Sequence, residues 1–383
     1  MKMIEYSEYR LGSLCTRFSS GKGISADLIN ETGRYPVIGG NGLRGYTDTF
    51  NFDGECAVIG RQGAYCGNVQ FFSGKGYMTE HAVVTQPNSA NNAKYLTYKL
   101  SGLSLGRFSG QAAQPGLSVT KLARLRIEMP PKWYQDKVAD ILSSYDDMIE
   151  VNSKRIKTLE QMAENLYKEW FVRFRFPGHE KAEFENGRPK GWRRGRISEF
   201  YTTSSGGTPS REHDEYYDDG TIPWIKTGEL QDCLLIDTEE KITEVAVKKS
   251  SAKFFPKDSV LMAMYGVNIG MLAYSTMDAT CNQACCVFRD KGNISTKHYL
   301  FQCLKSIRDY LLLISFGAAQ QNLSQDLIKR VRIVMPDKET VTRFEQKIQP
   351  LYNETEHLLK ANACLIRQRD LLLPRLMSGK LEV

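Results

Sequence analysis

The residues of this chain that are best suited to catalysis do not complete a catalytic or cofactor-binding motif. Residues 20–23 (Ser-Gly-Lys-Gly) resemble part of a phosphate-binding loop, but the first glycine and the serine or threonine after the lysine are absent, so we interpret them as a turn. Cys281, Cys285 and Cys286 could bind zinc as thiolates, yet no second ligand pair stands at the usual spacing. His81 is the best placed of the five histidines, and no nucleophile accompanies it. We therefore expect no catalytic residue, no metal site and no cofactor bound by the chain itself.

Polar side chains that can bind the edges of DNA bases gather instead in glycine-rich loops. Arginine and lysine can bind guanine, and asparagine and glutamine can bind adenine, through the major groove. Glycine lets a loop backbone approach a ligand closely, but it is equally common in ordinary turns. In the first half of the chain the candidate DNA-binding residues are Lys22, Asn41, Arg44, Arg61, Gln62, Tyr65, Gln111 and Gln114. In the second half they are Ser204, Thr208, Ser210, Arg211, Lys226, Thr227, Tyr265, Asn268, Asn282, Gln283, Gln320, Gln321 and Asn322.

The net charge of the chain is concentrated near its beginning. Residues 1–132 carry +6 of the formal charge of +7. A basic domain is compatible with phosphate contacts, because lysine and arginine release condensed counterions from DNA, although many proteins are mildly basic. A protein that reads a continuous duplex must gather its cations, so we expect Lys22, Arg44 and Arg61 to lie on one face of the first domain.

An internal repeat relates the two halves of the chain. Residues 112–130 match residues 318–336 at a constant offset, from an Ala-Ala-Gln segment to a Met-Pro pair. Upstream, Gly63 and Gly67 match two glycines of the second half at a slightly different offset. The change of offset indicates insertions within two diverged copies of one fold.

The repeat and the length of 383 residues predict two domains. Each copy begins with short apolar runs broken by glycine and asparagine, which are typical of strands and turns, and ends in a long stretch typical of a helix. The predicted fold class is α+β, with two mixed α/β domains, two long helices and an internal pseudo-two-fold repeat. The expected parts are domain one (1–132), the first helix (133–175), a Pro- and Gly-rich linker (176–191), domain two (192–338), and the second helix with a C-terminal tail (339–383).

Heptad patterns predict that the two long helices form an antiparallel coiled coil. Apolar residues recur at alternating spacings of three and four over residues 142–170 and again over residues 348–376. Pro350 and Pro374 interrupt the second pattern, and a kink is plausible at Pro350, near the start of that helix.

One asparagine in each pattern suggests the register of this coil. Asn152 falls at a d position and Asn362 at an a position, and antiparallel layers join an a residue to a d residue. Two asparagines in one layer can hydrogen-bond to each other and lock the register, although two separately solvated asparagines fit the sequence equally well. Placing them opposite each other pairs Leu142 with Leu372, Tyr145 with Arg369, Ile149 with Leu365, Ile156 with Leu358, Leu159 with Thr355, Ala163 with Leu351, Leu166 with Ile348, and Trp170 with Phe344.

The sequence contains no signal for export or membrane insertion. No apolar run reaches the ~18 residues that a membrane-spanning helix needs, and residues 1–6 lack the apolar core of a signal peptide. We therefore expect a cytoplasmic protein with no membrane partner. The nine cysteines, which show no regular spacing, are interpreted as reduced thiols.

Over essentially its whole length the chain resembles the specificity subunits of type I restriction-modification systems, which carry two target-recognition domains separated by two long helices. The usual Thr-Asn-Gln of the recognition domain appears as Thr-Cys-Asn-Gln at residues 280–283, whereas the first copy has Thr-Glu-His at residues 79–81. The similar segments are residues 192–198, 204–210 and 222–230 for the opening of one domain, residues 35–46 for another version of it, residues 169–172 for the end of the first helix, and residues 372–381 for the C-terminus.

The resemblance implies a subunit that performs no chemistry itself. It would bind double-stranded DNA, two methyltransferase subunits and restriction subunits, and the partners would bind S-adenosylmethionine and ATP with Mg²⁺. Its target would be bipartite and asymmetric, because the two copies have diverged. A helix of ~38 residues spans about 57 Å, which is longer than one ~34 Å turn of DNA, so the helices would fix the unread spacer.

Two other functions fit parts of the sequence. A coiled-coil scaffold that binds only protein is favoured by the long helices, but it gives no reason for two domains with elaborate polar loops. A self-sufficient DNA enzyme is disfavoured by the missing motifs. In particular, the only proline pair, at residues 130–131, does not supply the Asn/Asp-Pro-Pro-aromatic tetrad of adenine methyltransferases.

Overall fold

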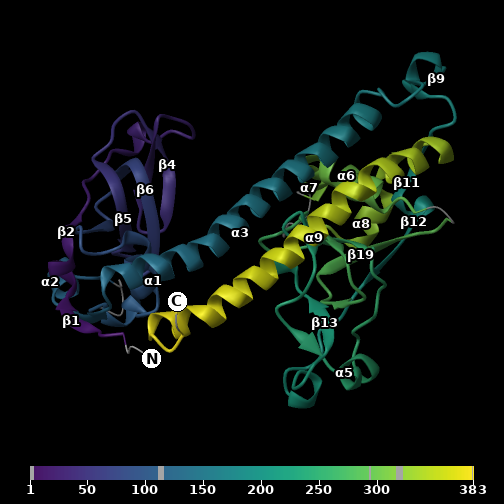
Figure 1. Cartoon of the computed structure of the whole chain (residues 1–383). Coiled ribbons are helices and arrows are strands. Elements are labelled where there is room, and N and C mark those ends of the chain that lie inside the picture. The colour runs from purple at the N-terminus through teal and green to yellow at the C-terminus, as the bar shows by residue number, and fades with distance from the viewer. Residues whose placement is uncertain (1–3, 111–115, 293–294, 316–321, 382) are drawn as a thin grey trace. The chain divides into compact units, whose positions relative to one another are not determined.

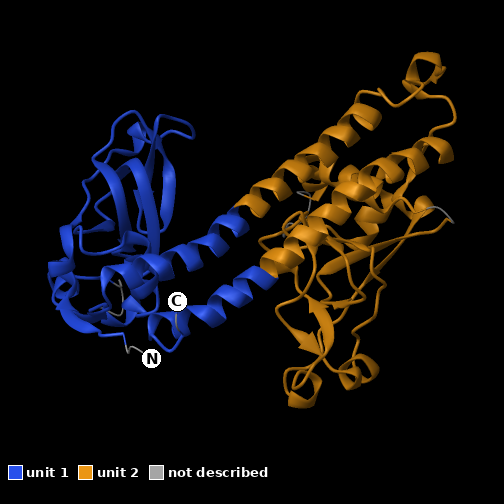
Figure 2. Cartoon of the chain, in the orientation of Figure 1, with its two compact units in different colours: residues 1–150, 364–383 blue, residues 151–363 orange. Residues whose placement is uncertain are grey.

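The computed structural model divides into two compact units, shown in different colours in Figure 2. Unit 1 comprises residues 1–150 and 364–383, and unit 2 comprises residues 151–363. Each unit combines one mixed α/β domain with part of both long helices, as the two colours of Figure 2 show on the elements that Figure 1 labels. The residues described are 4–110, 116–292, 295–315, 322–381 and 383.

The domain of unit 1 is built around a six-stranded sheet in the order β2-β7-β5-β6-β3-β4. β3 and β6 are parallel, and the other neighbouring strands are antiparallel. The second half of β5 and the first half of β7 are continuous buried apolar runs, as expected for strands covered on both faces. The strands are β2 (Cys15–Ser20), β3 (Tyr35–Gly39), β4 (Gly42–Thr47), β5 (Phe52–Gly60), β6 (Val69–Met78) and β7 (Ala82–Pro87).

Short helices and a strand pair close the core of this domain. The side chain of Asn92 accepts a hydrogen bond from Tyr95 N at 3.0 Å and so caps α1, which contacts β5 and β6. The core includes the fully buried Leu11, Tyr95 and Tyr134. The remaining elements are β1 (Ser7–Arg10) paired antiparallel with β8 (Arg126–Met129), η1 (Leu11–Leu14), η2 (Ala26–Leu28), α1 (Ala93–Ser101), η3 (Leu105–Phe108) and α2 (Val119–Ala123).

Unit 2 has a five-stranded sheet in the order β12-β19-β16-β17-β14 and a three-stranded sheet in the order β15-β13-β18. Every residue of β16 and β17 is buried. The strands are β11 (Arg193–Arg196), β12 (Tyr201–Ser205), β13 (Ile222–Ile225), β14 (Cys233–Leu235), β15 (Lys241–Ile242), β16 (Val260–Ala263), β17 (Leu272–Ser275), β18 (Thr280–Cys281), β19 (Cys285–Asp290) and β20 (Arg332–Met335). The helices are α4 (Ile197–Phe200), η6 (Asp214–Tyr216), η7 (Thr227–Glu229), α5 (Glu244–Lys249), α6 (Lys297–Ser306), α7 (Arg308–Ser315) and α8 (Gln325–Arg330).

The two domains repeat one topology. The antiparallel order β12-β19-β16-β17 of unit 2 corresponds to β2-β7-β5-β6 of unit 1, and a parallel strand follows in each case. The pair β11-β20 corresponds to β1-β8. Ser118 caps α2 and Ser324 caps α8 through the same side-chain contact, to Lys121 N and Leu327 N respectively. The mixed α/β fold of both copies and the repeat predicted from the sequence are confirmed.

The predicted linker contains a short hairpin. β9 (Phe184–Glu185) pairs antiparallel with β10 (Arg188–Pro189) after the single turn η5 (His179–Lys181). Asn186 and Gly187 form the turn with φ of 51° and 73°, the left-handed conformation that a two-residue Asn-Gly hairpin loop requires. The geometry of this turn therefore explains the asparagine and the glycine at these two positions of the linker.

The two long helices are α3 (Lys132–Tyr167), extended by the π-helical turn η4 (Lys168–Val172), and α9 (Lys338–Met377). α9 is continuous through Pro350 and Pro374. The helices run antiparallel, because successive contacts join rising residue numbers in α3 to falling numbers in α9. These contacts are Tyr134 with Leu376, Asp146 with Arg369, Asn152 with Asn362, and Trp170 with Phe344.

The asparagine layer has the geometry that the heptad register predicts. Asn152 Nδ2 donates to Asn362 Oδ1 at 2.9 Å, and both side chains are buried. Trp170 and Phe344 also lie in contact, with ring centroids 5.7 Å apart. The register places Arg369 opposite Tyr145, and its guanidinium forms an ion pair with the adjacent Asp146 at 2.6 Å. A charge-assisted hydrogen bond to a carboxylate stabilises a guanidinium more than contact with a tyrosine ring does.

The cysteines of the chain form no disulfide bonds. All nine cysteines fall within the described residues, and all are free thiols. Among the described residues, no helix is both long and apolar enough to cross a membrane, and no three potential metal ligands gather into a site.

Candidate nucleic-acid interface

Five segments of unit 1 meet around the turn between β6 and β7. We call them the first loop cluster, comprising residues 20–23, 38–44, 60–67, 78–82 and 116–117. Backbone hydrogen bonds join Gly21 N to Ala82 O (3.0 Å), Lys22 N to Met78 O (3.0 Å), Thr79 N to Ile38 O (2.9 Å), Arg61 N to His81 O (2.9 Å) and Leu117 N to Arg61 O (2.9 Å). Segments far apart in the sequence therefore form one continuous loop surface.

Unit 2 builds a corresponding second loop cluster, comprising residues 205–208, 225–228, 263–270, 281–285 and 322–323. Hydrogen bonds join Gly207 N to Cys281 O (2.9 Å), Asn282 N to Ile225 O (3.0 Å), Met264 N to Ala284 O (2.8 Å) and Leu323 N to Met264 O (2.8 Å). The hydroxyl of Thr208 also donates to Gln283 Oε1.

The clusters share a backbone framework. The bond from Arg61 to His81 corresponds to that from Met264 to Ala284, and the bond from Leu117 returns to Arg61 as that from Leu323 returns to Met264. The repeat therefore extends to individual hydrogen bonds, while the side chains mounted on the framework differ.

A glycine is required at the same place in both clusters. A Cβ at Gly21 would lie 2.0 Å from Met78 O, and a Cβ at Gly206 would lie 1.9 Å from Cys281 O. Such short distances would force the backbone apart. These two glycines thus permit the close approach of the segments.

Most candidates of the first half lie in the first loop cluster. Arg61 is half-buried, and its guanidinium donates to Leu117 O at 3.4 Å and Ser20 Oγ at 3.5 Å. Gln111 and Gln114 lie outside the described residues. That Lys22, Arg44 and Arg61 share one DNA-facing surface stays a prediction. The exposed candidates are Lys22, Asn41, Arg44, Gln62 and Tyr65.

The second-half candidates lie in or beside the second loop cluster, at different depths. Gln320 and Gln321 lie outside the described residues. Exposed candidates are Thr208, Ser210, Arg211, Tyr265, Gln283 and Asn322, and partly buried ones are Ser204, Lys226, Thr227, Asn268 and Asn282.

The two cations of this set are bound to carboxylates of the chain. Lys226 Nζ lies 3.0 Å from both Glu239 and Glu240, and Arg211 lies 2.5 Å from Glu240. The hydrogen bonds that Lys226 donates to Glu239 and Glu240 raise the pKa of its ammonium group. The Arg211 guanidinium also lies 4.1 Å from the centre of the Tyr217 ring. DNA contacts by these cations would require exchange of a carboxylate for a phosphate or a base.

Two asparagines support the loops through their side chains. Asn268 Nδ2 lies within hydrogen-bonding distance of three carbonyl oxygens, those of Thr227 (3.1 Å), Gly228 (3.2 Å) and Leu230 (3.2 Å). Asn282 Oδ1 accepts from Ala284 N at 3.1 Å. Base contacts by their remaining polar atoms stay predictions.

Sequence reasoning did not select Glu240, Arg308 or Asp232. Arg308 Nε donates to Gly270 O at 2.9 Å, and its guanidinium ion-pairs with Asp232. These partners are separated by many residues and follow no short motif, so only the chain's folding reveals that they support the loops.

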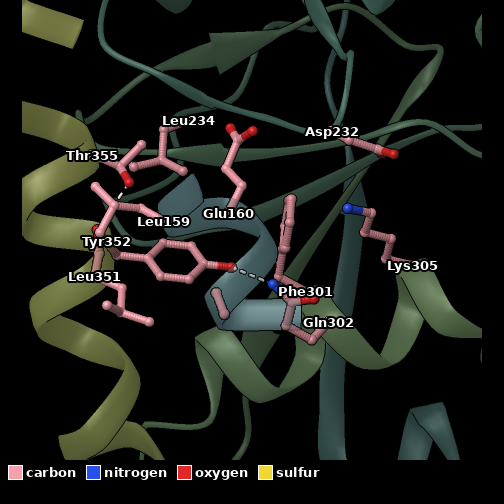
Figure 3. A pocket seen from close by; sticks show the side chains of 11 residues that line it. Leu159, Glu160, Asp232, Leu234, Phe301, Gln302, Lys305, Leu351, Tyr352 and Thr355 are labelled. Atoms are coloured by element: carbon pink, nitrogen blue, oxygen red, sulfur yellow. Dashed lines mark hydrogen bonds between the residues drawn. The ribbon is translucent and has the colours of Figure 1, made fainter. Parts of the chain in front are cut away.

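Unit 2 also has a small cavity beside the long helices, of about 20 Å³ (Figure 3). Gln302 Nε2 donates to Tyr352 Oη at 3.1 Å across one side, and Glu160 and Lys305 line another. This volume suits about one water molecule, so the cavity is not a ligand site.

Glu160 makes stability depend on pH. Burial raises the pKa of Glu160, and the charge of Lys305 offsets only part of that effect. Because its folded-state pKa lies above its unfolded-state value of about 4.3, the charged carboxylate costs stability at neutral pH, and this cost vanishes as pH falls below both values. We expect Glu160→Gln to unfold at higher denaturant than the parent at pH 7 and to converge with it near pH 4.

The control for this measurement is Glu185→Gln, which changes an exposed carboxylate in β9. Denaturant midpoints for both variants are compared with the parent across that pH range. A Glu160→Gln variant no more stable than the parent at pH 7 would contradict the expectation.

A family model described as the type I restriction modification DNA specificity domain matches residues 3–161 and 189–362. The chain belongs to this family. It is a specificity subunit, which recognises a DNA target sequence and does not catalyse a reaction. The two matched segments each contain one loop cluster, so both copies of the repeat belong to the family's DNA-specificity region.

Two relatives support this assignment, and one solved structure has a similar fold. The chain is 28% identical to the MjaIX specificity subunit of Methanocaldococcus jannaschii, over 78% of this chain and 71% of that protein. It is 25% identical to the HindI specificity subunit of Haemophilus influenzae, over 70% and 71% respectively. The fold is similar to that of a type I restriction-modification S subunit from M. genitalium, with a TM-score of 0.70, 16% identity and coverage of 98% and 97% of the two chains.

Proposed function

We propose that the chain reads a bipartite, asymmetric target in double-stranded DNA, with one half-site read by residues 1–132 and the other by residues 192–338. The two loop clusters support this proposal, because they place different polar side chains on the same backbone framework. Two domains that share a backbone framework but carry different polar side chains suit two half-sites of different sequence.

Membership of the family supports a proposal for the partners as well. The chain positions two methyltransferase subunits, and it recruits restriction subunits, on the target in the cytoplasm. S-adenosylmethionine belongs to the methyltransferase subunits and ATP with Mg²⁺ to the restriction subunits. The long helices α3 and α9 set the length of the unread spacer between the half-sites.

A scaffold that binds only protein is the alternative. The loop clusters argue against it, because their glycines, internal hydrogen bonds and exposed polar side chains serve no coiled-coil contact. The deciding experiment assembles the chain with its methyltransferase subunits and maps the adenines that they methylate. A split motif supports the proposal, and methylation without sequence preference would refute it.

The cations of the first loop cluster provide a quantitative test. We expect the double variant Lys22→Gln and Arg44→Gln to bind target DNA more weakly in the assembled methyltransferase. The slope of log affinity against log salt should also become shallower by about 0.9 for each lost phosphate contact.

The matched control is Lys248→Gln with Lys249→Gln, two exposed lysines of α5 outside the loop clusters. Affinity is measured by fluorescence anisotropy over a range of salt concentrations. Equal slopes for the parent and the loop variant would show that Lys22 and Arg44 do not contact DNA phosphates.

A further inference from the structure

One segment of each loop cluster is the same loop built twice. These glycine loops are Gly60–Gly67 in unit 1 and Ala263–Gly270 in unit 2. Gly67 N donates to Gly60 O at 2.8 Å, as Gly270 N does to Ala263 O. The loop interiors agree as well, because Cys66 N donates to Gly63 O at 3.0 Å and the equivalent bond to Gly266 O, from Ile269 N, is 3.2 Å.

Glycines fix the shape of both loops. φ is 79° at Gly63 and 90° at Gly266, and it is 87° at Gly67 and 78° at Gly270. Residues that carry a Cβ are strained in this left-handed region, so both loops have glycine at the same two positions.

Neighbouring residues anchor the glycine loop of unit 2. Asn268 Nδ2 faces three carbonyl oxygens of the segment after β13, and Arg308 Nε donates to Gly270 O at 2.9 Å. Arg308 is held in turn by its ion pair with Asp232. These contacts therefore hold in place the part of the loop that carries its tip.

At that tip stands Val267, whose relative exposure of 104% is the largest among the exposed large hydrophobic residues of the described chain. The corresponding residue of unit 1 is Ala64, which is also exposed. A branched apolar side chain that is fully exposed to water contributes no burial free energy to folding. It would contribute favourable free energy to binding if a partner covered it with apolar surface. Among base edges in the major groove, the 5-methyl group of thymine offers such a surface.

We propose that Val267 is a specificity-determining residue that contacts the 5-methyl group of a thymine in the half-site read by the second domain. The inference rests on the proposed function. The polar surroundings support it, because Thr227 and Gln283 belong to the same loop cluster and can bind neighbouring polar base edges. Ala64 gives the first domain a smaller apolar tip on the same loop.

The test uses the chain assembled with its methyltransferase subunits and duplexes that contain the mapped target. Each thymine of the second half-site is replaced in turn by deoxyuridine, which lacks only the 5-methyl group. For the parent we expect one position at which this replacement weakens binding about fourfold, the value of one buried methyl group. Val267→Ser should bind the thymine and uracil duplexes equally at that position.

Two further variants separate the contact from a general loss of binding. Val267→Thr keeps one methyl group and should retain discrimination against uracil at the same position. Val245→Ser changes an exposed valine of α5, outside the second loop cluster, and should behave as the parent. The first half-site should be read unchanged by all of these variants.

Results that overturn the inference differ from those that overturn the proposed function. If Val267→Ser discriminates against uracil as strongly as the parent does, or if the parent is indifferent to uracil at every position of the second half-site, Val267 does not read a thymine. If the parent complex methylates without a split motif, the proposed function itself fails.

Discussion

Replacing residues 1–132 with the corresponding domain of a relative that reads another target is expected to change one half of the methylated motif completely and leave the other half intact. Each loop cluster is held together by hydrogen bonds within its own unit, so neither needs the other to keep its shape. The chimeric chain is assembled with the methyltransferase subunits, and the methylated adenines are mapped in a host genome. Changes in both half-sites would show that the domains do not read independently.

The structure also indicates how this exchange can fail and how to control for it. Asn92 Nδ2, in the domain, donates to Asp136 of α3 at 2.8 Å, and Tyr98, also in the domain, hydrogen-bonds to Asp146 of α3. A junction at residue 132 separates such partners and should lower stability. A second chimera that exchanges all of unit 1, residues 1–150 and 364–383, keeps them together. We expect the same new half-site from both chimeras and higher stability from the second.

Features that depend on local periodicity were predictable from the sequence. The long helices follow from apolar residues at spacings of three and four, and the repeat follows from matched segments. The same periodicity allowed Asn152 to pair with Asn362 but fitted two separately solvated asparagines equally well, and the hydrogen bond between their side chains decides between the two. The periodicity within each helix and the match between the two copies can both be recognised in the sequence without knowledge of the fold.

The arrangement of the site could be predicted only in part. Glycine-rich polar segments indicated which loops matter, but pairing between distant strands decides which of them meet. The bonds of Lys226 and Arg211 to Glu240 join segments with no shared motif, and they alter how readily these cations can reach DNA. Val267 was not among the candidate DNA-binding residues, because an apolar residue in a sequence is ordinarily assigned to the core. Only the folded chain shows that it is exposed.

The largest loss of stability is expected from Phe344→Ala in α9. Phe344 is fully buried, and its ring centroid lies 4.7 Å from that of Phe171 and 5.7 Å from that of Trp170. Removing a buried aromatic ring deletes these contacts and leaves a cavity that a packed helix pair cannot close completely. The expected cost is about 3–5 kcal/mol of unfolding free energy. Tryptophan fluorescence during guanidinium unfolding follows the change, because Trp170 lies in the same layer.

Two comparisons decide whether this loss comes from the aromatic layer between the helices. Phe254→Ala removes the same side chain from an exposed position and should cost less than about 1 kcal/mol. Trp170→Phe keeps an aromatic ring opposite Phe344 and should cost less than Phe344→Ala, since the cavity it leaves is smaller. A loss for Phe344→Ala no greater than that of Phe254→Ala would mean that the layer contributes little. In that case the asparagine pair and the flanking apolar layers would have to hold α3 and α9 together in unit 2.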